Sequence, residues 1–229
     1  MRAILAPSLI DRVDRDHQQP DHEFLRRRWV VAVVLTVGAV LLGISLSIRP
    51  GDPAFYPLTL AVALTWVIGA LLSGPLHLGW MQFRGGLRRP IITPLITGLV
   101  TGGVFVVGSL VVREIGPLRD SVNDVLAHAR YGETWAILAV ALLNGVAEEL
   151  FFRGALFAAI GRRHAVLIST VVYAAATIVT LNAMLVFAAA LLGLVLGLQR
   201  RTTGGVLAPI LTHVTWSTIM LFALPALIR

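Results

Sequence analysis

Long stretches of mostly apolar residues follow one another along this chain. The first three lie at residues 29–48, 55–76 and 91–112, and each has about the 20 residues that an α-helix needs to cross a bilayer. Four more lie in the second half, at residues 134–160, 165–181, 183–198 and 204–228. This pattern predicts about seven transmembrane helices, with a tight joint around Asn182 that makes the fifth and sixth short or tilted.

Two segments break the apolar pattern. Residues 1–28 are rich in charged side chains of both signs, which is typical of a solvated tail rather than of a cleaved signal peptide. Residues 113–135 place Arg119, Asp120 and other charges around apolar positions such as Val122. We expect this amphipathic segment, between the third and fourth spans, to lie on a membrane surface.

The composition agrees with a membrane protein. Of the 229 residues, 57% are hydrophobic and only 14% are charged, whereas about 25% charged residues is usual for a globular domain. A single soluble domain cannot hide so much apolar surface, which excludes an ordinary cytosolic enzyme. The chain has no cysteine, so disulfides, thiolate metal sites and cysteine nucleophiles are excluded. The predicted fold class is an all-α polytopic membrane protein.

The net charge of +7 is carried by arginine, because the chain has no lysine. With the N-terminus inside, most of the loop arginines fall on the inner side of the membrane. The arginines that fall on the outer side are Arg49, Arg113, Arg119, Arg130 and Arg229. This asymmetry predicts a cytoplasmic N-terminus and an outer C-terminus, and we assign no nucleic-acid partner to the basic charge. An arginine-only chain rich in alanine and valine suggests a bacterial plasma membrane protein.

Charged residues within the fourth span are the most informative feature. Glu148, Glu149 and Arg153 lie inside an apolar stretch, where each charge costs about 2.5–3.5 kcal/mol on insertion scales. Glu149 and Arg153 are four residues apart and can pair along one helix face, which a purely structural ion pair would also explain. Glu148 points about 100° away and has no cation within reach on its own helix. It is therefore the stronger functional candidate.

Polar residues of two other spans lie at a similar depth. His213 and Ser217 are four residues apart in the last span, and Thr177 lies 12 residues into the fifth. At 1.5 Å per residue, these positions and Glu148 fall within several ångströms of one another in depth. We therefore expect one polar site drawn from three helices. Tyr173, Phe152 and Trp216 are interpreted as packing residues.

The residues of the second half carry a resemblance. The stretch from Glu148 to Arg153 reads EELFFR, and it resembles the EExxxR motif of the CPBP family, which includes CAAX prenyl proteases of the Rce1 type and bacteriocin-processing or immunity proteins. The segment from Gly197 to His213 is similar to the closing segment of that family. We expect the chain to divide into a cytoplasmic tail at 1–28, transmembrane helices and the interfacial segment at 29–133, and a CPBP-like core, which the resemblance implies, at 134–229.

The resemblance also implies roles for these side chains. Glu148 would be the general base that activates a water, Glu149 and Arg153 would orient it, and His213 would stabilise the oxyanion. Two positions depart from the family pattern. The family has an aromatic residue followed four positions later by histidine, where this chain has Tyr173 and Thr177. It has histidine followed four positions later by asparagine, where this chain has His213 and Ser217.

Three functions remain open on this reading. The first is a glutamate-dependent intramembrane endopeptidase that cleaves a membrane protein or peptide within or beside the lipid bilayer. The second is a catalytically degenerate family member that acts as a membrane scaffold, binding or immunity protein. A small transporter with Glu148 as its proton site is a weaker third. No cofactor is predicted, and no metal either, because one histidine and two carboxylates without an HExxH motif are a poor zinc site.

Overall fold

The computed structural model describes residues 2–14, 19–83, 85–161 and 163–228, and helices make up nearly all of it. The elements before the fourth span are α1 (Arg2–Leu9), α2 (Asp21–Ser47), α3 (Phe55–Ser73), β1 (Met81–Phe83), β2 (Gly86–Arg88), α4 (Ile92–Val112) and α5 (Gly116–Arg130). The fourth span is continuous through α6 (Thr134–Glu148), the π-helix η1 (Glu149–Leu156) and α7 (Phe157–Ile160). The remaining elements are α8 (Ala165–Thr177), the 3₁₀ turn η2 (Ile178–Thr180), α9 (Ala183–Thr203) and α10 (Leu207–Leu227).

Six helical stretches in the described part of the chain are long and apolar enough to cross a membrane. They are α2, α3, α4, the continuous α6–η1–α7, α9 and α10, while α8 with η2 forms a shorter apolar helix. This is the predicted all-α polytopic membrane fold. The predicted spans agree with these helices to within a few residues at most ends. The largest difference is α2, which begins at Asp21, eight residues before the start of the predicted apolar stretch.

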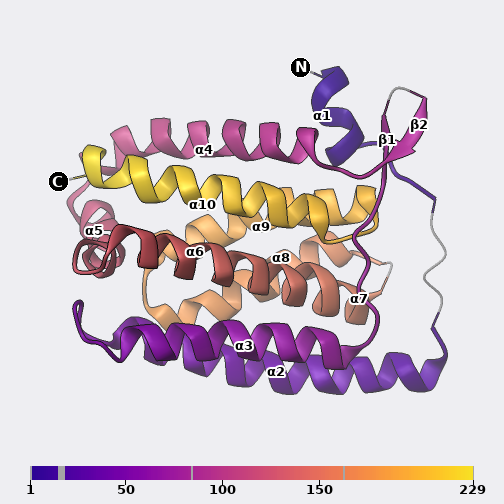
Figure 1. Ribbon diagram of the computed structural model, residues 1–229, viewed down its shortest axis with the longest axis horizontal. Helices are drawn as coiled ribbons and strands as arrows, with labels where there is room; N and C mark the ends of the chain where they lie inside the picture. Colours follow the sequence, from indigo (N-terminus) through magenta and orange to yellow (C-terminus); the bar gives the residue numbers. More distant parts are fainter. Residues whose placement is uncertain (1, 15–18, 84, 162, 229) are drawn as a thin grey trace.

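The fourth span runs through the middle of the bundle. In Figure 1, α4 and α10 lie side by side along one edge, and α2 and α3 lie side by side along the opposite edge. The α6 helix lies between these pairs, in contact with both α3 and α10, and α8 and α9 pack against each other behind it. A central position explains how this span can carry charged side chains, since they face other helices rather than lipid.

The tight joint predicted around Asn182 has a definite geometry. Leu181 adopts a left-handed backbone conformation with φ of 55°, and the chain turns there from η2 into α9. The Asn182 side chain caps α9 by accepting hydrogen bonds from the backbone N–H groups of Met184 and Leu185, at 3.1 and 3.0 Å. It also donates to the backbone oxygen of Ser121 in α5, at 2.6 Å. One asparagine thus starts a helix and ties the amphipathic segment to the bundle.

The predicted amphipathic segment is the helix α5, which lies at the end of the bundle, at the left of Figure 1. Its apolar positions Val122 and Leu126 are buried, and they pack with Ile228 from the C-terminal end of the chain. Its charged positions Arg119 and Asp120 are exposed and pair with each other. This arrangement matches the expected division of the segment into an apolar and a polar face.

The polar tail differs from the expectation of a fully solvated segment. Helix α1 packs against α9 and α4, and Ser8 is completely buried. The hydroxyl of Thr202 donates to the backbone oxygen of Ser8 at 2.6 Å, and the N–H of Val13 donates to the backbone oxygen of Thr202 at 3.1 Å. Hydropathy alone missed this docking because these hydrogen bonds join residues far apart in the chain. The small hairpin of β1 and β2 was also not anticipated.

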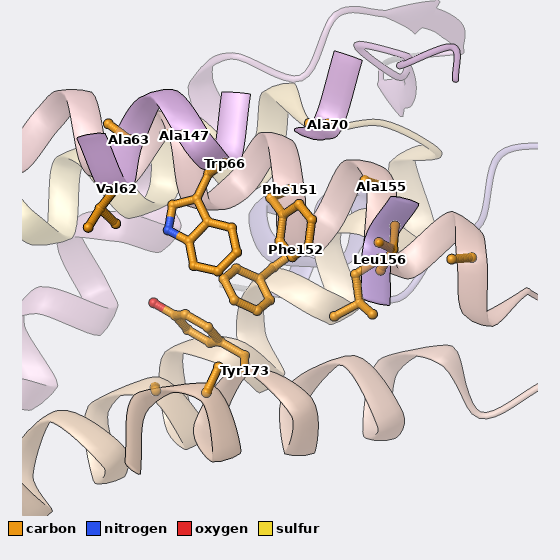
Figure 2. Close-up of a cluster of buried hydrophobic side chains, with 14 residues drawn as sticks. Val62, Ala63, Trp66, Ala70, Ala147, Phe151, Phe152, Ala155, Leu156 and Tyr173 are labelled. Carbon is orange, nitrogen blue, oxygen red and sulfur yellow. The ribbon is translucent and has the colours of Figure 1, made fainter. Parts of the chain in front are cut away.

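A cluster of rings joins the fourth span to its neighbours. Figure 2 shows Trp66 from α3, Phe151 and Phe152 from η1, and Tyr173 from α8 stacked across the bundle. The ring centroids of Trp66 and Phe151 lie 4.6 Å apart, as do those of Phe152 and Tyr173. These distances are typical of well-packed aromatic pairs. The cluster fixes the rotation of the fourth span about its axis and so sets the direction of its charged side chains.

Candidate functional site

The EExxxR motif lies at the start of a π-helix. Regular α-helix ends at Glu148, and the eight residues Glu149–Leu156 follow with a wider turn before the α-helix resumes. π-Helical turns are rare, and they occur frequently at functional sites. The Arg200 side chain, from α9, donates through Nε to the backbone oxygen of Arg153 at 2.6 Å. A neighbouring helix therefore supports the backbone of this irregular segment.

Glu149 and Arg153 form a buried ion pair, as their spacing predicted. Both side chains are completely buried, and Arg153 Nη1 donates to Glu149 Oε1 at 2.9 Å. The same oxygen lies 2.8 Å from Nδ1 of His213, which comes from α10. Since an ionised carboxylate can only accept, the proton of that hydrogen bond is on Nδ1. The depth argument had grouped His213 with Glu148, but its direct hydrogen bond is to Glu149.

Glu148 faces a different environment. It is partly buried, and its Oε2 accepts a hydrogen bond of 2.5 Å from the hydroxyl of Tyr173. The Tyr173 ring packs against the Phe152 ring and against the Arg153 guanidinium, whose Cζ lies 4.6 Å from the Tyr173 ring centroid. Tyr173 had been interpreted as a packing residue, and it is also the polar partner of Glu148. The sequence did contain a signal for this contact, because Tyr173 places a phenol in the middle of a span, one helical turn before Thr177.

Glu148 lines two cavities. The smaller, which we call the inner cavity, has a volume of about 180 Å³ and is also lined by Tyr173, Thr177 and His213. The larger cavity, which we call the apolar chamber, has a volume of about 570 Å³. It extends from Glu148 to the apolar side chains of α5. Trp216 borders both cavities. The inner cavity has room for several water molecules and offers them polar partners, so Glu148 and His213 can act on the same water.

The two positions that depart from the family pattern lie in different places. Thr177 lines the inner cavity, and its hydroxyl donates to the backbone oxygen of Tyr173 at 2.9 Å. Ser217 lines the apolar chamber and is absent from the residues that line the inner cavity. Of the expected polar residues, the structure therefore brings Glu148, Thr177 and His213 to one cavity and places Ser217 outside it.

Several buried polar atoms near the motif have no hydrogen-bond partner among the described residues. They include Oε2 of Glu149, Nε and Nη2 of Arg153, and the indole Nε1 of Trp216. The described residues contain no group of three or more histidine or acidic side chains placed to hold a metal ion. The chemistry that the arrangement can support with its own side chains is acid–base chemistry on a water between Glu148 and His213.

The comparisons with known proteins bear on this same region. The family described as type II CAAX prenyl endopeptidase Rce1-like matches residues 130–219. No curated protein and no solved structure matches the chain. The matched residues cover the fourth span, α8, α9 and the first half of α10, and they include every residue of the inner cavity that comes from α6, α8 and α10. An Rce1-like domain supports an intramembrane protease-type function in general. Residues 130–219 of this integral membrane protein thus form an Rce1-like domain, consistent with the CPBP family.

Proposed function

We propose that this protein is a glutamate-dependent intramembrane endopeptidase, in which Glu148 activates a water and His213 stabilises the oxyanion. One observation carries the proposal: Glu148 and His213 both line the inner cavity, among apolar helices and at the motif of an Rce1-like domain. The substrate would be a membrane protein or peptide that is cleaved within or beside the bilayer. The arginine asymmetry supports an orientation with the N-terminus in the cytoplasm and the C-terminus outside, in the plasma membrane of a bacterial cell.

The charges of the site support this assignment of roles. Glu149 and Arg153 neutralise each other, so the cluster is neutral overall when Glu148 is a carboxylate and His213 an imidazolium. A neutral arrangement avoids the cost of an uncompensated charge in a low-dielectric interior. In that state Glu148 can accept a proton, while His213 donates Nδ1–H to Glu149 and carries a second donor at Nε2. These are the states that a base and an oxyanion donor require.

The reaction follows from these protonation states. Glu148 takes one proton from the water as its oxygen forms a bond to the carbonyl carbon of the substrate. The carbonyl oxygen becomes an oxyanion and accepts a hydrogen bond from Nε2–H of His213. The proton held by Glu148 then passes to the nitrogen as the C–N bond breaks. The products are a carboxyl end and an amino end, and Glu148 returns to its carboxylate form.

A cleavage assay in lipid nanodiscs tests the proposal. The purified protein is incubated with a library of single-span peptides, and products are identified by mass spectrometry. We expect Glu148→Gln to lower turnover at least about 10³-fold and His213→Ala to lower it about 10²-fold. Glu114→Gln is the matched control, because Glu114 is exposed and pairs with Arg113 far from the cavity. Equal turnover by Glu148→Gln and the unaltered protein would contradict the assigned role.

A binding or scaffold function without hydrolysis is the second candidate. Thr177 supports it, because a hydroxyl that already donates to the Tyr173 backbone cannot replace an imidazole as a proton acceptor. So does Ser217, which lies in the apolar chamber. On this reading the unaltered protein cleaves no peptide, whereas the double variant Thr177→His/Ser217→Asn gains turnover. Robust cleavage by the unaltered protein eliminates this second candidate.

A further inference from the structure

The hydroxyl of Tyr173 adds a polar group at a position where the family pattern requires an aromatic ring. That pattern asks for an aromatic ring at this position and a histidine at 177, and the ring is present while the histidine is not. The ring at position 173 is a phenol, and its hydroxyl donates a hydrogen bond to Glu148 Oε2 at 2.5 Å. Tyr173 comes from α8, the same helix that would have carried the histidine. One polar group of α8 therefore still reaches the candidate base.

The phenol is held firmly enough to direct a carboxylate. Its ring packs on the Phe152 ring at 4.6 Å between centroids, and the Arg153 guanidinium lies over the Tyr173 ring, with Cζ 4.6 Å from the ring centroid. The Thr177 hydroxyl bonds to its backbone oxygen. Tyr173 itself is only 9% exposed. A rigid donor on Oε2 leaves the second oxygen of Glu148 as the one available to a water, which is how neighbouring groups pre-organise a base.

We propose that Tyr173 is a positioning residue that orients Glu148 toward the inner cavity and takes over, from α8, the place of the histidine missing at position 177. The inference rests on the proposed function for its kinetic consequence, because positioning matters to turnover only if Glu148 is the base. The contact itself is independent of catalysis. Two experiments therefore separate the failure of the positioning role from the failure of the proposed function.

The first experiment does not need turnover. Dicyclohexylcarbodiimide is an apolar reagent that attaches to protonated carboxyl groups inside membranes, and mass spectrometry measures how fast it labels Glu148. A donated hydrogen bond favours the unreactive carboxylate and covers one of its oxygens. Tyr173→Phe should therefore label about 10-fold faster at pH 7 than the unaltered protein, as expected for the loss of one hydrogen bond to a charged group.

The matched control is Tyr131→Phe, which removes the same hydroxyl from an exposed tyrosine. It should label at the rate of the unaltered protein, and Glu148→Gln identifies the labelled position. Because phenylalanine keeps the ring contacts with Phe152 and Arg153, Tyr173→Phe should unfold within about 2 °C of the unaltered protein. Equal labelling rates for Tyr173→Phe and Tyr131→Phe would overturn the proposal, whatever the protein cleaves.

The second experiment uses the peptide assay. We expect Tyr173→Phe to lower kcat about 10- to 100-fold and to leave KM within about twofold, since the lost contact acts on the base and not on the substrate. Adding Thr177→His to this variant should restore kcat to within about threefold, whereas adding Thr177→Val should not. A kcat unchanged by Tyr173→Phe, in a protein that Glu148→Gln inactivates, would overturn the positioning role and leave the proposed function standing.

Discussion

The two halves of the bundle are built differently. In the half that holds η1, aromatic rings and close helix contacts fill the interior, and the Trp66 ring packs against Gly38 where no larger side chain would fit. In the half beneath α5, the helices spread around the apolar chamber of about 570 Å³. Glu149 belongs to the first half and is completely buried, while Glu148, its neighbour in sequence, faces the second.

This contrast shows how adjacent carboxylates can serve different purposes. A charged group surrounded by packed side chains is fixed by its partners, and it can support a neighbour without meeting a ligand. A charged group at the floor of a cavity can meet one. The packed half therefore supports the site rigidly, and the hollow half is the route by which a ligand reaches it. Variants that disturb one half should have effects that equivalent variants in the other half lack.

The largest effect should come from breaking the buried ion pair. Arg153→Ala leaves the carboxylates of Glu148 and Glu149 to share the charge of His213, and losing one partner of a buried pair typically costs about 3–5 kcal/mol of unfolding free energy. Reversible unfolding in mixed micelles measures the loss. Arg113→Ala is the control, because it breaks a pair whose side chains are 45% and 70% exposed and should cost less than about 0.5 kcal/mol. A loss below about 1 kcal/mol for Arg153→Ala would contradict the contrast between the halves.

A smaller effect should follow from truncating one apolar side chain in each half. Phe151→Ala removes a completely buried ring and leaves a void of roughly 100 Å³, so its cavity term alone is about 2 kcal/mol at about 24 cal/mol per Å³. Leu221→Ala enlarges a chamber that is already hollow, so it should lose less unfolding free energy than Phe151→Ala by about that cavity term. The same unfolding measurement compares them. Equal losses would show that the chamber is as tightly packed as the ring cluster.

The smallest effect concerns α5, the helix that borders the apolar chamber. Asn182→Ala removes the cap of α9 and the hydrogen bond to α5, at a cost of about 1 kcal/mol. Amide hydrogen exchange should speed up at Met184 and Leu185, whose N–H groups lose their acceptor, and throughout α5. Exchange in the ring cluster around Trp66 should stay unchanged. Faster exchange there would mean that the two halves do not open independently.

Hydropathy could predict the membrane spans because each segment that crosses the bilayer must itself be apolar and must satisfy its own backbone hydrogen bonds. The stretch at 91–112 became a helix over Ile92–Val112, and the pairing of Glu149 with Arg153 followed from a spacing of four residues. Both depend only on residues close together in the chain. The docking of α1 depends instead on a hydrogen bond from the Thr202 hydroxyl to the backbone oxygen of Ser8, two residues that are 194 positions apart in the chain.

The candidate site was predictable in its members but not in its connections. Depth along each helix brought Glu148, Thr177 and His213 to a common level, and all three line the inner cavity. Rotation about each helix axis decides which atoms meet, and that depends on packing across the bundle. For this reason the hydrogen bonds from His213 to Glu149 and from Tyr173 to Glu148 became visible only in the structure.

The short helix α8 has a consequence for the surrounding lipid. Its 13 residues and the three of η2 span about 25 Å, whereas the hydrocarbon core of a typical bilayer is about 30 Å thick. Lipids meet a short hydrophobic segment by thinning locally. The membrane should therefore be thinner beside Leu181, which is 91% exposed at the end of this helix. Headgroup water should lie closer to the depth of Tyr173 there than elsewhere around the protein.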